Sequence, residues 1–113
     1  MKLSKQTAKH LREVYFGGNW TASNVRDVLS DVTWEEATQK IGSSNTIAVL
    51  TNHISYCVPA VLEVLNGNTL VAKDELSFAH PPITNSQEWN AFLENIWNNI
   101  SAFCDKIEDL EDA

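Results

Sequence analysis

The chain has 113 residues, of which 43% are hydrophobic and 20% are charged. This length and composition predict a single folded domain over 1–113 and exclude a disordered chain. The formal net charge of −7 disfavours nucleic acids and anionic membrane surfaces as partners, because an acidic surface repels both.

Two helices are predicted in the N-terminal part of the chain. Ser4 can cap the first, which continues to about Phe16, because a serine hydroxyl accepts hydrogen bonds from free amides. The glycine pair at 17–18 ends this helix, and Asn19 or Thr21 caps the next. The residues expected on their buried faces are Leu3, Ala8, Leu11, Val14 and Tyr15, then Val25, Val28, Leu29 and Val32.

The N-terminal segment is amphipathic and lacks the continuous apolar stretch of a signal peptide. We therefore expect a cytoplasmic location.

Further along, Thr33 and Glu36 have the spacing of a capping box, in which each side chain satisfies the other residue's free amide. This box predicts a short helix that runs through Lys40 and stops at Gly42. Its expected core contacts are Trp34 and Ala37.

The longest apolar segment, residues 45–67, predicts the central helix. Ser44 or Asn45 can cap it, and Gly67 can end it. Pro59 removes an amide donor inside the helix, so we expect a kink there. Polar residues interrupt the segment, which favours a core helix over a membrane span. The side chains expected to face the core recur at spacings of three and four: Ile47, Leu50, Ile54, Cys57 or Val58, Val61 and Leu65.

One histidine of the central helix suggests chemistry. His53 lies on or beside the predicted buried face, one turn from Leu50 and Cys57. A neutral imidazole there needs either a hydrogen-bond partner or a metal ion. A structural histidine and a metal ligand both remain open at this point. Cys57 and Cys104 lack a paired-cysteine spacing, so we expect both to be buried free thiols.

A long connection over residues 68–84 follows the central helix and contains His80-Pro81-Pro82. Its length allows it to join two helices that are not antiparallel neighbours. His80 either reaches back to a site or belongs to an ordinary surface loop. A second capping box, Asn85 with Glu88, begins the last helix. Its expected buried residues are Trp89, Phe92, Leu93, Ile96, Ile100, Phe103, Ile107 and Leu110.

Several segments together point to a known family. The chain has Phe-Gly-Gly-Asn-Trp at 16–20, Val-Thr-Trp-Glu-Glu-Ala-Thr at 32–38 and Ile-Ala-x-Leu-x-x-His-Ile at 47–54. It also has Val-Leu-x-x-Leu-x-Gly at 61–67 and an apolar helix after Trp89. Over nearly its whole length the sequence resembles the DinB/YfiT-like superfamily.

The resemblance implies an all-α fold, an up-down DinB-like bundle with a long crossover. It also implies a divalent metal such as zinc or nickel, held by one histidine of the second bundle helix and two from an HxxxH on the last. His53 matches the first ligand position. No HxxxH is present, and the chain ends where that helix would begin, so we expect a bundle that lacks the family's final helix. His80 and Cys57 are the further candidate ligands.

A bundle without that helix would leave an apolar groove between the central and last helices. Large exposed apolar patches are rare on monomers and usually mark an interface. Either the N-terminal helix fills the groove, or two chains pair symmetrically. We expect a homodimer, because the aromatic residues of the last helix exceed what one short helix would cover.

Three functions are consistent with these features, and enzymatic activity is undecided among them. The first is a non-catalytic DinB-like scaffold that forms a homodimer. The second is a metal-dependent hydrolase or thiol transferase whose site, built around His53, is completed across the dimer. The third is an interaction module whose acidic segment at residues 105–112 meets a basic partner.

Overall fold

The computed structural model describes residues 3–18, 24–72 and 74–110, and its regular elements over these residues are all helical. The all-α prediction is thus confirmed. The elements are α1 (Leu3–Phe16), α2 (Val25–Ser30), α3 (Trp34–Thr38), α4 (Ile47–Ser55), α5 (Cys57–Leu65), the 3-10 helix η1 (Asp74–Phe78) and α6 (Ser86–Glu108).

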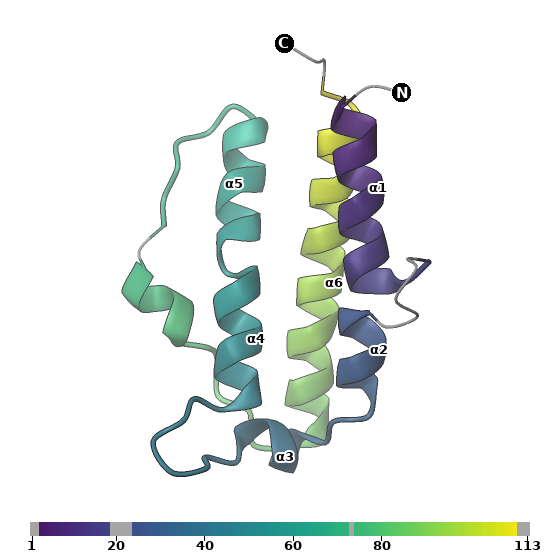
Figure 1. Ribbon diagram of the computed structural model, residues 1–113. Coiled ribbons are helices and arrows are strands. Elements are labelled where there is room, and N and C mark those ends of the chain that lie inside the picture. The colour runs from purple at the N-terminus through teal and green to yellow at the C-terminus, as the bar shows by residue number, and fades with distance from the viewer. Residues whose placement is uncertain (1–2, 19–23, 73, 111–113) are drawn as a thin grey trace.

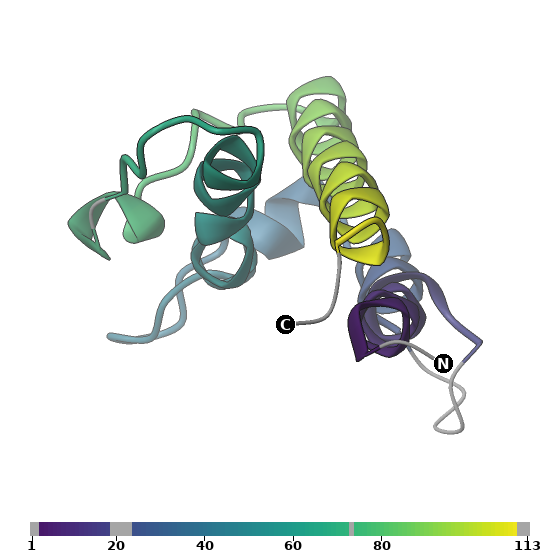
Figure 2. The same ribbon diagram turned by 90° about the horizontal axis from the view of Figure 1, so that it is seen from above.

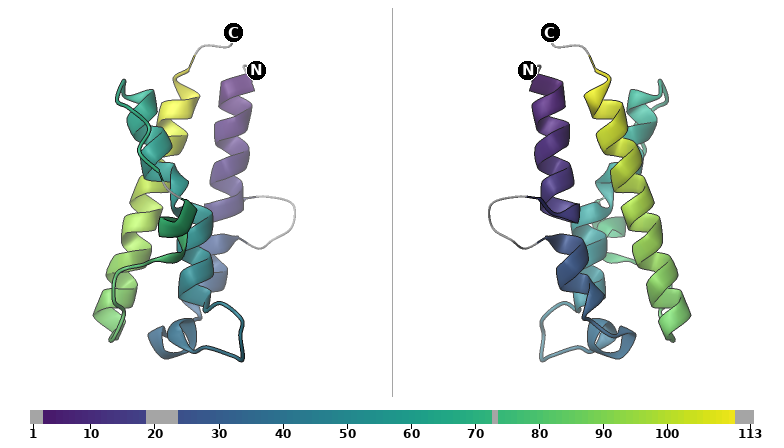
Figure 3. Two further views of the ribbon diagram at one scale, coloured as in Figure 1. Left: turned by 90° about the vertical axis from the view of Figure 1, so that its left-hand side faces the viewer. Right: turned by 90° about the vertical axis from the view of Figure 1, so that its right-hand side faces the viewer.

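The helices form three columns (Figures 1 and 3). α1 and α2 follow one another down one column, and α3 lies at the bottom of the molecule, where it contacts α4. α4 and α5 rise as a second column, and α6 is the third. Seen from above, α6 has α1 on one side and α5 on another (Figure 2). α6 is thus the helix that both other columns contact.

The connection between α5 and α6 is a crossover. It leads from the end of α5 back down to the base, with η1 packed against α4 on the way (Figure 1). As a result α4–α5 and α6 run in the same direction, whereas α1 is antiparallel to α6. This confirms that the long connection joins helices that are not antiparallel neighbours.

Both predicted capping boxes lie at helix starts. The Thr33 side chain accepts from the Glu36 amide, and the Glu36 carboxylate accepts from the Thr33 amide. Asn85 caps α6 by accepting from the Glu88 amide. There, however, the Glu88 carboxylate accepts from the amide and hydroxyl of Thr84. Hydrogen bonds to the charged form hold the pKa of Glu88 below its ordinary value.

Other helix boundaries differ from the sequence predictions. Ser4 lies inside α1, where its hydroxyl donates to the Leu110 carbonyl at 2.8 Å. Asn24 caps α2, and the predicted caps Asn19 and Thr21 lie outside the described residues. Thr46 caps α4 in place of Ser44 or Asn45. α3 ends at Thr38, two residues before the predicted Lys40.

The central helix is divided where the proline predicted a kink. α4 ends at Ser55 and α5 begins at Cys57, with Tyr56 between them in helical dihedral angles. Pro59 has no N–H to offer the Ser55 carbonyl, which explains a break one turn before the proline. At the far end Gly67 adopts a φ of +93°, so the left-handed conformation predicted for it is present.

The core lies mainly along α6. Its buried residues are Trp89, Leu93, Ile96, Ile100 and Cys104, so the predicted face of this helix is correct for its main part. Trp89 also donates from Nε1 to the Val32 carbonyl at 3.0 Å, which ties α6 to the segment after α2. Leu110 is exposed, because α6 ends at Glu108.

The predicted core face of the central helix is wrong in α4. Three of its apolar side chains, Ile47, Leu50 and Ile54, are exposed, and Leu50 and Ile54 are 48% and 56% exposed. The buried residues of α4 are instead Ala48, Thr51 and Ser55. In α5 no side chain is buried. The periodicity therefore identified a real apolar face, but this face points away from the rest of the chain.

In the N-terminal helices, too, some residues predicted to be buried are exposed, but others are buried as predicted. Ala8 and Tyr15 of α1 and Leu29 of α2 are buried as predicted. Three other residues of the predicted faces, Leu3, Val14 and Val28, are exposed. α1 packs on α6 and contacts α2, so it does not cover the exposed face of α4.

Candidate functional site

His53 holds the crossover against α4. Its Nδ1 lies 2.8 Å from the Ser77 hydroxyl, and its ring stacks on Phe78 with ring centroids 4.4 Å apart. The neighbouring Asn52 donates from Nδ2 to the carbonyls of Ser77 and Ala79. His53 is nevertheless exposed, which corrects its predicted place on or beside a buried face. Its ring has a structural partner, and its second nitrogen, Nε2, is the atom available to a ligand.

His80 and Cys57 lie in separate environments. His80 is half-buried in the crossover, where Nδ1 donates to the Pro81 carbonyl at 2.7 Å and the ring packs near Phe92. This fits the ordinary-loop interpretation. Cys57 is the first residue of α5 and is exposed, so the prediction that it is buried is wrong. Cys57 thus lies one helical turn after His53, on the accessible side of the central column.

The metal site implied by the family resemblance needs more donors than the described part of one chain brings together. Within residues 3–18, 24–72 and 74–110, no three His, Cys, Asp or Glu side chains gather as a metal-binding group. Catalytic zinc usually takes three protein ligands. His53 and Cys57 together supply two, so the described part of one chain does not fit the implied metal, and further donors would have to come from a second chain.

The second cysteine is buried and unreactive by comparison. Cys104 is fully buried on α6 and is free, as predicted. Burial raises the pKa of its thiol, an effect that the nearby Arg12 guanidinium partly opposes. A neutral, enclosed thiol is a poor nucleophile and a poor metal ligand. Cys104 therefore belongs to the core.

The acidic end of α6 is partly paired within the chain. Arg12 of α1 donates to Glu108 and, at 2.6 Å, to Asp105. These two carboxylates raise the pKa of Arg12. Two of the acidic residues considered for a basic partner are thus already used to join α1 to α6. Glu111 and Asp112 lie outside the described residues.

Two surfaces of the central column remain as candidate binding surfaces. The first, which we call the apolar stripe, consists of Ile47, Leu50 and Ile54 on α4. α4 and α5 together form a 19-residue run with a mean hydropathy of 1.4 that is only 17% buried. By length and composition this run is apolar enough to cross a membrane, a property that core helices of soluble proteins share. Its low burial marks a face able to contact another apolar surface.

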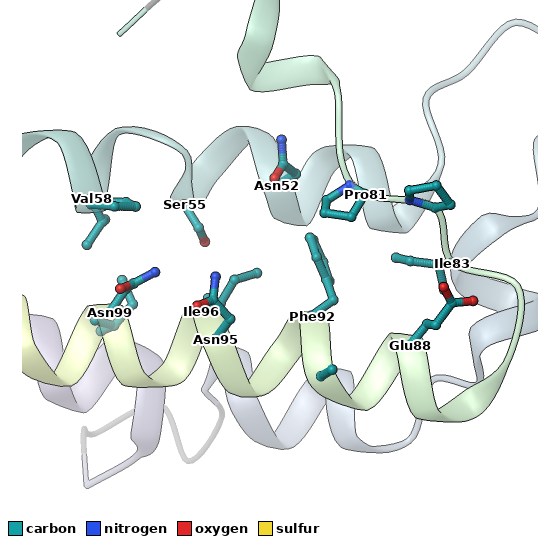
Figure 4. Close-up of a pocket in the computed structure, with 14 residues that line it drawn as sticks. Asn52, Ser55, Val58, Pro81, Ile83, Glu88, Phe92, Asn95, Ile96 and Asn99 are labelled. Carbon is teal, nitrogen blue, oxygen red and sulfur yellow. The ribbon is translucent and has the colours of Figure 1, made fainter. Parts of the chain in front are cut away.

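The second surface is a groove of about 390 Å³ between the central column, α6 and the crossover. Figure 4 shows Asn52 and Ser55 on one wall, with Phe92, Asn95 and Asn99 opposite. The expected groove between the central and last helices is therefore present, but its walls are mixed. Its apolar lining residues are Val58, Pro59, Pro81, Pro82, Ile83, Ala91, Phe92, Ile96 and Ile100.

The polar residues of this groove were not predicted from the sequence. Asn95 and Asn99 were not among the candidate site residues, and Ser55 was one of the polar residues that interrupt the apolar segment. One signal was present, since Asn95 and Asn99 are four residues apart and therefore share a helix face. It did not reveal that α4 turns its own polar side toward them.

Comparison of the chain with protein-family models, with curated proteins and with solved structures found no match.

Proposed function

We propose that this chain is a non-catalytic, DinB-like helical scaffold that acts in the cytoplasm as a homodimer through the apolar stripe. The observation that carries the proposal is the exposure of Ile47, Leu50 and Ile54 at three- and four-residue spacing. One stripe against another would bury on both chains the apolar area that each chain leaves in water. Burial of each large side chain contributes roughly 1.5–3 kcal/mol.

The distribution of charge favours a second copy as the occupant. Each chain carries a net charge of −7, so most pairs of surfaces would repel one another. The run Ile47–Leu65 contains a single acidic residue, Glu63, and no Lys or Arg. It is thus a face on which two copies can meet without like charges in contact. A two-fold axis would place the same residues opposite each other.

The DinB-like assignment within this proposal is supported by the all-α fold, by the crossover between parallel columns and by the position of His53 on the central helix. Of the three histidines in the sequence, His10, His53 and His80, only His53 matches a ligand position of the family. A non-catalytic scaffold is consistent with this single match.

The test is sedimentation velocity on the wild type, on Leu50→Glu and on Val14→Glu. Val14 on α1 is 49% exposed, which matches Leu50 closely and makes it the control. A carboxylate buried without a partner is unfavourable by several kcal/mol. We expect a dimeric wild type, a Leu50→Glu variant weakened on the order of a hundredfold or more, and a dimeric Val14→Glu variant. A monomeric wild type would refute the proposal.

A second candidate function rests on His53 and Cys57, which are exposed and one turn apart on the central column. Two chains would supply two such pairs, from which three side chains could hold zinc and leave its fourth position open to water or substrate, as in catalytic sites. In this alternative the dimer is a divalent-metal-dependent hydrolase or thiol transferase. Elemental mass spectrometry of untagged protein should then find one metal per two chains, lost in His53→Ala and in Cys57→Ser. Equal metal content in His53→Ala would eliminate this candidate.

A further inference from the structure

We propose that the groove between α4–α5 and α6 binds an uncharged, amphipathic small molecule that carries hydrogen-bonding groups along one edge. This site is independent of the proposed dimer. Asn52 and Ser55 line the groove, whereas Leu50 and Ile54 form the apolar stripe on another face of α4.

Ser55 provides the first argument. Its side chain is only 7% exposed, and its Oγ has no hydrogen-bond partner within the described part of the chain. Figure 4 shows this hydroxyl pointing across the groove toward Asn95 and Ile96 of α6. A buried polar group without a partner is unfavourable by about 1–3 kcal/mol. A ligand with a hydrogen-bonding group at this point would remove that penalty.

The break in the central helix places this group at the groove. Because Pro59 has no N–H, the carbonyl of Ser55 lacks its ordinary helical donor. The unpartnered hydroxyl of Ser55 lies at this break, at the end of α4. Pro59 itself lines the groove beside it. The kink thus gives the groove a polar centre within an apolar wall.

Three carboxamides surround this centre. Both donor contacts of Asn52 are made with the carbonyls of Ser77 and Ala79, which leaves its Oδ1 as an acceptor on the groove side (Figure 4). Asn95 and Asn99 lie one turn apart on α6. A carboxamide both donates and accepts hydrogen bonds. The matching ligand therefore carries donor and acceptor groups on the same edge.

The remaining lining defines the body and the charge of the ligand. Phe92, Ile96 and Ile100 of α6 and the prolines of the crossover offer apolar contact. None of the described residues that line the groove is Lys, Arg or His. The charged group there is Glu88, whose low pKa keeps it anionic. An anion would thus meet no cation, and the volume of about 390 Å³ suits a small molecule.

The test uses two fluorescent dyes that differ in one group. N-phenyl-1-naphthylamine is uncharged and has an N–H donor, and 1-anilinonaphthalene-8-sulfonate adds an anionic sulfonate to the same skeleton. Titration of the wild-type protein should show saturable binding of one uncharged dye per chain. We expect the anionic dye to bind at least about tenfold more weakly, since it meets only Glu88.

Variants locate the site. Ser55→Ala should weaken binding of the uncharged dye about three- to tenfold and raise the melting temperature of the free protein, because it removes an unpartnered hydroxyl. Asn99→Ala should weaken dye binding without that gain in stability. The matched controls are Ser101→Ala and Asn98→Ala, which change exposed residues of α6 outside the groove and should leave binding unchanged.

Three results would overturn the proposal. One is equal or tighter binding of the anionic dye. Another is unchanged affinity in both Ser55→Ala and Asn99→Ala. The third is loss of dye binding in Leu50→Glu, which would place the dye on the apolar stripe. Retained binding in Leu50→Glu supports the groove whether or not the chain dimerises, so this proposal and that of the dimer fail separately.

Discussion

The two sides of α6 follow opposite patterns. On the α1 side, Cys104 is fully buried, and Arg12 pairs with Asp105 and Glu108 across the helix interface. On the α4–α5 side, polar groups such as Ser55 face inward, while Leu50 faces water. At its contact with α6 the first side encloses a buried thiol and pairs its charges, whereas the second leaves the Ser55 hydroxyl without a partner and has Leu50 exposed.

The contact between α1 and α6 therefore serves mainly stability, whereas the α4–α5 column is suited to binding another molecule. A helix pair with a closed core and internal ion pairs contributes mainly to the free energy of folding. A column with apolar residues outside and an unpartnered hydroxyl inside has groups that only another molecule can satisfy. The α4–α5 column is accordingly where both binding proposals lie.

The largest expected difference is in thiol reactivity. Cys57 on the open side is exposed, whereas Cys104 is fully buried and has a raised pKa. A buried thiol reacts only when the structure opens, so we expect Cys104 to react at least about a thousandfold more slowly. Stopped-flow kinetics with an aromatic disulfide reagent on Cys57→Ser and Cys104→Ser will measure each rate. Similar rates for the two thiols would contradict the closed core.

Large-to-small substitutions should affect the two sides unequally. Ile100→Ala removes a fully buried side chain that clusters with Tyr15 of α1 and Cys104, and it should lower the free energy of unfolding by about 2–5 kcal/mol. Leu50→Ala removes an exposed side chain and should change it by about 0.5 kcal/mol or less. Denaturant unfolding at low protein concentration, where a dimer does not contribute, provides both values. A large loss in Leu50→Ala would show that the stripe belongs to the core of a single chain.

The ion pairs between α1 and α6 should have a smaller effect. Arg12→Gln should lower stability by about 1 kcal/mol or less, because the guanidinium is partly exposed and solvent screens the pair. A double-mutant cycle with Glu108→Gln isolates the coupling. Repetition in high salt should reduce it. No measurable coupling would mean that apolar packing alone holds α1 against α6.

The smallest effect concerns Glu88 at the start of α6. Its folded-state pKa is lowered by hydrogen bonds from Thr84, so the charged form is favoured in the folded protein. The resulting stability is present at neutral pH and is lost as the pH falls through this lowered pKa. Wild type and Glu88→Gln should therefore differ most at neutral pH and converge in acid. Chemical denaturation over a pH series checks this, and a constant difference would contradict it.

Some features were predictable because they depend on local sequence. The box of Thr33 with Glu36, the N-cap of Asn85 and the break before Pro59 involve residues three or four apart, which interact whatever the rest of the chain does. The buried face of α6 was also predictable, since Trp89, Leu93 and Ile96 are too apolar to leave in water.

The orientation of α4 was not predictable in the same way. The spacing of Ile47, Leu50 and Ile54 defines an apolar face, but it does not say whether the same chain covers that face. The prediction that His53 lies on or beside a buried face was wrong for the same reason, because it depended on the same helix face. The polar lining of the groove was missed because a polar residue such as Asn95 on an amphipathic helix is expected to face solvent until a second polar face is found opposite it.

Hydroxyl-radical footprinting at micromolar and near-millimolar chain concentration tests the central claim most directly, since radicals oxidise accessible aliphatic side chains. We expect Leu50 and Ile54 to become protected as concentration rises, while Val14 and Val28, which are also exposed, keep their oxidation rates. Unchanged oxidation of Leu50 and Ile54 across that range would contradict the account, because it would mean that no second copy covers the apolar stripe.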